Sequence, residues 1–129
     1  LDLSGLVRLE SLELRGSTKF KEVKGRGDLV SLKYLDMRCC TSLESLSVED
    51  LFSLEVLDVR SCENLTVLGV SRSTSLRSLL LWNCHRLREV TGLFSLSKLK
   101  FLDINECYSL KTIDKSFLQN FYPELLVAK

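Results

Sequence analysis

The sequence predicts a solenoid, a fold in which short coils of chain stack on one another and share one continuous core. Three observations support this prediction. Two leucines three residues apart, followed two positions later by a third apolar residue, recur five times. The central leucines of successive motifs lie 22 or 23 residues apart, and a serine or cysteine follows each motif at the same distance. Units of this length cannot bury their own apolar face, so they must stack.

Five strands of one parallel sheet are expected from these motifs. The motifs span residues 9–14, 32–37, 54–59, 76–81 and 99–104. Their apolar residues alternate with polar ones, which is the period of a strand that buries one face. We therefore expect strands near 10–15, 33–38, 55–60, 77–82 and 100–105, side by side on the concave face of a leucine-rich-repeat solenoid.

The segments between these strands are expected to return the chain along the opposite wall of the core. In the second unit Leu46, Val48 and Leu51 supply the apolar side chains of that wall. The return segments 25–30, 47–52, 69–74 and 91–96 are short and show no sustained helical periodicity, and several carry glycine or serine. We therefore expect irregular loops and short turns on the convex face.

Residues 1–129 are expected to form a single domain of about five repeats and a partial sixth. Tyr122, Leu125 and Val127 fall 23 residues after the corresponding apolar positions of the fifth motif, which predicts a last short strand near 124–128. The first residues, Leu3, Leu6 and Leu9, already fit the repeat pattern, and no polar terminal unit stands before them in the sequence. We expect the domain to be a fragment of a larger receptor.

The charge balance does not favour nucleic acid or an anionic membrane surface as a partner, so the partner must be inferred from local patterns. The chain carries 18 Lys and Arg residues against 17 Asp and Glu residues, a net charge of +1. Such a balance provides no basic stripe for phosphates, and no apolar stretch is long enough to span a bilayer. His85 is the only histidine, and no phosphate-binding loop, nucleophile elbow or zinc-helix motif is present. We expect no enzyme activity, cofactor, metal site or small-molecule substrate.

Four of the five cysteines recur with the period of the repeats. Cys40, Cys62, Cys84 and Cys107 should stack as a ladder at the ends of the strands, where the side chain turns inward and must be small. We expect reduced, buried thiols, with a disulfide, a metal site or a redox role as the alternatives. Cys39 lies nearer the solvent-facing side, where we expect an ordinary, partly buried cysteine, with a reactive thiol as the alternative. Free thiols indicate a reducing compartment, the cytoplasm or the nucleus.

The solvent-facing positions of the strands form columns, and such a surface is where a solenoid binds its partners. One column contains Glu13, Asp36, Asp58, Leu80 and Asp103, and a second, two residues further along each strand, contains Arg15, Arg38, Arg60, Trp82 and Asn105. Adjacent strands lie about 5 Å apart, so the acids and arginines should form a charged lattice. Such a lattice either satisfies itself or offers its arginines to carboxylates of a partner.

The charged lattice is interrupted in the fourth repeat, where Leu80 replaces an acid and Trp82 replaces an arginine. A third solvent-facing column holds Tyr34, Val56 and Phe101, so these five residues are expected to form an apolar patch ringed by charge. Aromatic anchors within a polar rim are typical of protein-binding surfaces. The protein-binding candidates are therefore Trp82, Leu80, Phe101, Val56, Tyr34, Arg38, Arg60 and Arg15. The alternatives are that another domain covers the patch or that it has no role.

Two repeats resemble those of a known family. Residues 54–68 (LEVLDVRSCENLTVL) and 99–113 (LKFLDINECYSLKTI) are similar to the C-terminal repeats of plant nucleotide-binding leucine-rich-repeat disease-resistance receptors of the TIR class. The resemblance covers nearly the whole chain. It implies a recognition module without its own chemistry, which binds a pathogen effector or contacts the receptor's nucleotide-binding domain to hold it inactive.

The chain differs from that family at the dipeptide that follows the cysteine ladder, and it also resembles a second class of receptor. Leu46-Ser47 and Leu68-Gly69 stand where such receptors commonly carry Leu-Pro. The substrate-recognition repeats of F-box-type ubiquitin-ligase receptors also use cysteine ladders, although their units are longer and carry Ile-Thr-Asp after the ladder. An extracellular receptor ectodomain is the third alternative, against which the ladder of free thiols argues.

Overall fold

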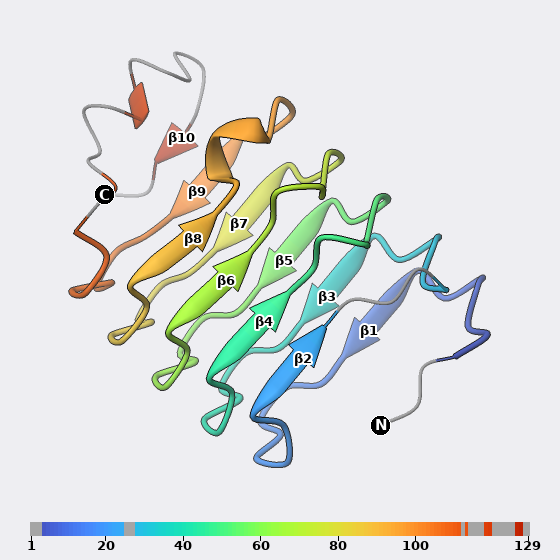
Figure 1. Cartoon of the computed structure of the whole chain (residues 1–129), viewed down its shortest axis with the longest axis horizontal. Helices are drawn as coiled ribbons and strands as arrows, with labels where there is room; N and C mark the ends of the chain where they lie inside the picture. The colour runs from blue at the N-terminus through green and yellow to red at the C-terminus, as the bar shows by residue number, and fades with distance from the viewer. Residues whose placement is uncertain (1–3, 25–27, 112, 114–117, 120–125, 128–129) are drawn as a thin grey trace.

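Two parallel β-sheets of short strands face each other across one apolar core (Figure 1). The computed structural model describes residues 4–24, 28–111, 113, 118–119 and 126–127. In this part of the chain the first sheet contains, in spatial order, β1 (Ser11–Glu13), β3 (Tyr34–Asp36), β5 (Val56–Asp58), β7 (Ser78–Leu80), β9 (Phe101–Asp103) and β10 (Leu126–Val127). The second sheet contains β2 (Glu22–Lys24), β4 (Ser45–Ser47), β6 (Val67–Gly69) and β8 (Glu89–Thr91).

The register of the first sheet follows the repeat period. The central leucines pair in sequence from Leu12 through Leu35, Leu57 and Leu79 to Leu102, each one repeat from the next. The chain moves to the second sheet after each of β1, β3, β5 and β7 and then returns, so each of these coils contributes one strand to each sheet. This arrangement confirms the predicted leucine-rich-repeat solenoid.

The repeated leucines form the core between the two sheets. Leu57 and Leu79 of the first sheet and Leu46 and Leu68 of the second are buried. Each such side chain stabilises the fold by about 1.5–3 kcal/mol through removal of its apolar surface from water. Burial is less complete in the first coil, where Leu12 is only partly covered because no coil in the described residues packs on its outer side.

The second sheet was not predicted. Leu46 and its equivalents do line the opposite wall of the core, but they do so from regular strands that pair in parallel, Leu46 with Leu68 and Leu68 with Val90. Strands such as β4 (SLS) and β6 (VLG) contain serine or glycine, which are common in turns, so the sequence favoured turns at these positions. Beyond the strands the return segments contain turns, as expected, and one 3-10 helix, η1 (Leu93–Ser95).

The observed strands are shorter than the predicted ranges and lie within them. The last strand differs in register, because Val127 pairs with Leu102, whereas the sequence spacing places Leu125 opposite that leucine. A shift of two residues leaves the alternation of strand faces unchanged, so the apolar pattern cannot distinguish the two registers. Tyr122, Leu125 and residues 25–27 of the first return segment lie outside the described residues.

The tight turn after each of β1, β3, β5, β7 and β9 uses left-handed backbone. Gly16, Cys39, Ser61, Asn83 and Glu106 form this column, with φ between 59° and 73°. The amide N–H groups of the first four donate to carbonyl oxygens of the next coil at 2.8–3.0 Å, which extends the sheet ladder into the turn.

Among the described residues, no helix has the length and apolarity needed to cross a membrane.

Candidate functional site

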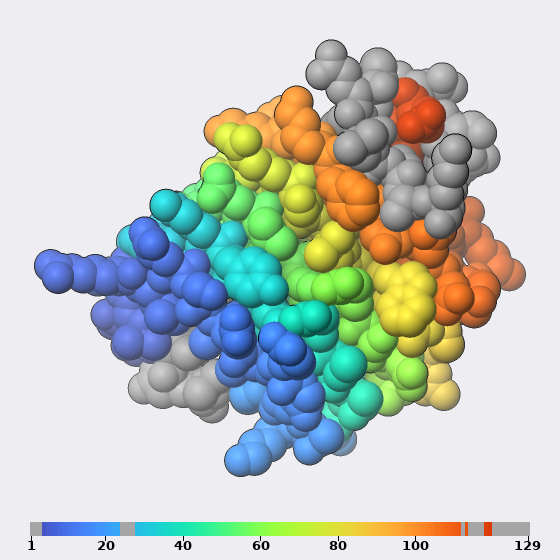
Figure 2. All heavy atoms as spheres, turned by 180° about the vertical axis from the view of Figure 1, so that it is seen from behind, coloured from blue at the N-terminus to red at the C-terminus, as the bar shows by residue number. Residues whose placement is uncertain are grey.

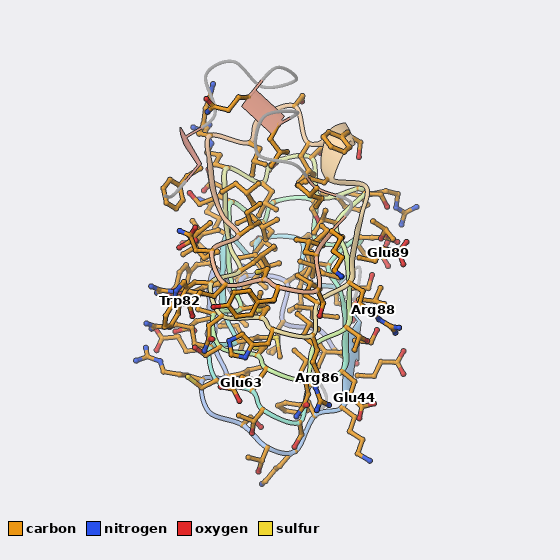
Figure 3. The ribbon with its side chains drawn as sticks, turned by 90° about the vertical axis from the view of Figure 1, so that its left-hand side faces the viewer. Glu44, Glu63, Trp82, Arg86, Arg88 and Glu89 are labelled. Atoms are coloured by element: carbon orange, nitrogen blue, oxygen red, sulfur yellow. The ribbon has the colours of Figure 1, made fainter. Side chains whose placement is uncertain are left out.

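The outer face of the first sheet carries the three predicted columns of side chains. Figure 2 looks onto this face, where the yellow side chains of the β7 coil lie between the green ones of the β5 coil and the orange ones of the β9 coil. Figure 3 shows Trp82 on the outer side of this sheet, while Glu44, Arg88 and Glu89 lie on the opposite side of the molecule. The strand register places the residues of the column that starts at Glu13, and those of the column that contains Tyr34, opposite one another.

Two acids of the lattice are buried, which corrects the prediction that they face water. The exposed fraction is 0% for Asp36 and 2% for Asp58. Arg38 covers Asp36, donating from Nε to Oδ1 at 3.0 Å and from Nη2 to Oδ2 at 2.8 Å. Arg60 covers Asp58 in the same way at 2.9 and 2.7 Å. In both pairs the arginine's backbone N–H also donates to its aspartate.

The pairs are linked across strands into an alternating series of charges. Arg15 Nη2 lies 3.2 Å from Asp36 Oδ2 on the next strand, and Arg38 Nε lies 3.4 Å from Asp58 Oδ2. The hydrogen bonds that Arg38 donates to Asp36 hold the pKa of Asp36 below its usual value, and those that Arg60 donates to Asp58 raise the pKa of Arg60. The lattice therefore satisfies itself along most of its length, with its carboxylates shared between neighbouring arginines.

The series stops at β7. In register with Asp58, the next strand carries Leu80, which cannot accept a hydrogen bond. Leu80 is half-buried, and the neighbouring Trp82 is 40% exposed. Trp82 is a large apolar side chain in contact with solvent, at a position where the three preceding repeats carry arginine.

The predicted apolar patch is assembled in part by direct neighbours and in part by diagonal ones. Tyr34 and Val56 are opposite each other, and both are half-buried. Ser78 stands between Val56 and Phe101 in that column, so the two are not adjacent. Leu80 is the diagonal neighbour of both, at the roughly 7–8 Å separation that long side chains can bridge. Leu80 is therefore the centre of the patch.

The cysteine ladder links successive coils. Each thiol donates to a carbonyl oxygen of the preceding coil, including Cys62 Sγ to Met37 O at 3.0 Å and Cys84 Sγ to Val59 O at 3.2 Å. Burial raises the pKa of Cys62 to about 12 and that of Cys107 to about 11, so these thiols stay protonated at neutral pH.

All five cysteines are free, and Cys39 is exposed. In the described part of the chain, no three His, Cys, Asp or Glu side chains are grouped so that they could hold a metal ion. His85 stacks on Tyr108 with the ring centroids 5.3 Å apart.

One feature of this sheet was not anticipated from the sequence. A shallow groove of about 220 Å³ runs along the starts of the strands, lined by Lys33, Ser53, Glu55, Ser75, Arg77 and Lys98. Arg77 Nε lies 3.6 Å from Glu55 Oε1 across the strands, and both side chains are exposed. The groove mixes charges of both signs and is a polar margin of the candidate surface.

Comparison with known families supports the repeat assignment. The family model described as Zer-1-like, leucine-rich repeats matches residues 45–119, which include β7 and the whole of its coil. A search of curated proteins finds no match. Leucine-rich-repeat solenoids are typically non-catalytic scaffolds that bind proteins. The match concerns the repeats themselves and does not extend to the plant immune receptors that they resemble.

Proposed function

Since the chain belongs to the Zer-1-like leucine-rich-repeat family, we propose that it is a non-catalytic protein-recognition module whose docking surface is the outer face of the first sheet. We define this surface by Trp82 and Leu80 at its centre, with Tyr34, Val56, Phe101 and the arginines Arg15, Arg38 and Arg60 around them. The stacked coils supply a rigid platform, and the outer side chains supply the recognition.

The observation that carries this proposal is the replacement of a charged pair by an apolar one at β7. In the two preceding strands an aspartate and an arginine occupy these positions and bond to each other, whereas Leu80 has no side-chain carboxylate to pair with an arginine and Trp82 has no guanidinium. An exposed tryptophan in a charged surround has the composition of an interface hot spot. Covering the apolar surface of this tryptophan with a partner would remove that surface from water and so stabilise the complex.

The docking surface is tested with a displayed library of random 12-residue peptides selected on the immobilised chain. We expect the selected peptides to bind the wild-type chain and to lose binding to the double variant Trp82→Ala, Leu80→Asp. Phe52→Ala is the matched control, because Phe52 is a comparably exposed ring outside the docking surface. Peptides that bind the double variant as well as they bind the wild type would reject the surface.

The narrower proposal is that this module belongs to a plant disease-resistance receptor and recognises a pathogen effector or the receptor's own nucleotide-binding domain. The resemblance of residues 54–68 and 99–113 supports it. The free thiols support a location in the cytoplasm or nucleus, which are reducing compartments. The upstream coding sequence is the test. A nucleotide-binding P-loop would support this assignment, whereas an F-box or a secretory signal peptide would overturn it.

A further inference from the structure

Arg60 is the point at which the alternating series of charges is left incomplete. Arg15 lies within 4.0 Å of two carboxylates, those of Glu13 and Asp36. Arg38 likewise contacts two, those of Asp36 and Asp58. Within the described residues Arg60 contacts the carboxylate of Asp58 alone, because Leu80 occupies the cross-strand position.

From this we infer that the partner is a protein segment that presents one carboxylate to Arg60 and an adjacent apolar side chain to Trp82 and Leu80. The inference rests on the proposed docking surface and names its partner's chemistry. The partner's carboxylate would take the cross-strand position that an aspartate fills on the two preceding strands.

The geometry of the neighbouring strands supplies the template for this contact. Cross-strand arginine-to-carboxylate distances are 3.2 Å from Arg15 and 3.4 Å from Arg38. A guanidinium has five N–H donors in a planar fork, and Asp58 takes two of those of Arg60, from Nε and Nη2. The side chain of Arg60 is 38% exposed, against 27% for Arg38, so its remaining donors are open to a partner.

The charge of the surface favours a single carboxylate over a polyanion. Arg15, Arg38 and Arg60 are balanced by Glu13, Asp36 and Asp58, and Asp103 lies on the far side of Leu80 in the same column. A nucleic acid or a multiply phosphorylated ligand needs several uncompensated cations. A ligand with one carboxylate beside an apolar side chain fits this site, because the carboxylate can pair with Arg60 and the apolar side chain can pack on Trp82.

The test uses the same 12-residue peptide library and a pair of matched variants. Leu80→Asp restores the cross-strand carboxylate and occupies Arg60, whereas Leu80→Asn removes the same apolar contact without adding charge. We expect the selected peptides to carry Asp or Glu next to an apolar residue. We expect Leu80→Asp to weaken their binding about tenfold more than Leu80→Asn does. Arg88→Gln, on the opposite side of the molecule, is the control for a change of net charge.

The outcomes separate this inference from the proposed function. The partner's carboxylate would be ruled out if Leu80→Asp and Leu80→Asn weaken binding equally, or if the selected peptides carry no acidic residues. The docking surface would still stand in that case if Trp82→Ala abolishes binding. No enrichment of peptides on the wild type over the Trp82→Ala variant would overturn both. Circular dichroism of each variant shows whether its fold is retained.

Discussion

At the scale of single residues, the docking surface depends on two aspartates that are buried beneath arginines. An ionised carboxylate away from water is tolerated only when charged hydrogen bonds compensate it, and Asp36 receives them from the Nε, Nη2 and backbone N–H of Arg38. The same bonds hold the arginines in place, so the positions of the charged groups around Trp82 are fixed before any partner arrives.

Replacing Asp36 by asparagine is expected to lower the free energy of unfolding by about 3 kcal/mol at pH 7, since it leaves Arg38 without its principal partner. The pKa of Asp36 is lowered in the folded chain, so its contribution is present above the unfolded value of 3.8 and is lost as the pH falls through the folded value. Urea unfolding between pH 2 and 7 should show the wild type and D36N converging at low pH.

Glu13→Gln is the control for this titration. The side chain of Glu13 is 61% exposed, so its loss should cost less than about 1 kcal/mol. An Asp36→Asn variant whose stability stays below that of the wild type by the same amount at every pH would contradict the role assigned to the carboxylate.

The cysteine ladder gives a second prediction for a single residue. Cys62→Ala removes one weak hydrogen bond and a small volume from the core, at an expected cost of about 1 kcal/mol. Cys62→Asp places a carboxylate in the same buried slot and should cost about 4 kcal/mol or more. Chemical denaturation of both variants tests this, and equal losses would show that the slot does not face the core.

At the scale of the structural element, the turns between strands set the spacing of the coils. Gly92 precedes η1 with φ +83°, and a Cβ built there would lie 2.2 Å from Ser71 Cα in the preceding coil. Gly16 has nearly the same backbone, with φ +73°, but a Cβ there would meet nothing within 4 Å. The two glycines therefore separate backbone strain from close packing between coils.

We expect Gly16→Ala to cost about 1 kcal/mol, from the left-handed backbone alone. Gly92→Ala should cost at least about 2 kcal/mol more, because the backbone of neighbouring coils must also move apart. Thermal unfolding of the two variants provides the comparison. Similar melting temperatures would mean that the coils adjust freely at this turn, which would contradict the tight stacking.

At the scale of the whole molecule, the repeat period determined most of what could be predicted. The regular return of leucines located β1, β3, β5, β7 and β9 of the first sheet, and the stacked cysteines followed from the same spacing. Strands of the second sheet such as Ser45–Ser47 and Val67–Gly69 contain serine or glycine, which are common in turns, so the sequence favoured turns there and the second sheet was missed.

The candidate site was predicted less completely, because its properties depend on neighbours one repeat away. The columns gave Leu80 and Trp82 as the interruption of the lattice. The burial of Asp36 and Asp58 depends on how the arginines lie over them, which side-chain spacing does not specify. Ser78 lies between Val56 and Phe101 and separates them, which can be seen only once the strand register is known.

The most direct test of the docking surface is nuclear magnetic resonance mapping of a peptide selected on the chain. Titrated into isotopically labelled protein, the peptide should shift the signals of Trp82, Leu80 and Arg60 together with those of the adjoining positions on β5 and β9. Shifts confined to β2, β4, β6 and β8 would place the peptide on the opposite sheet and contradict the account.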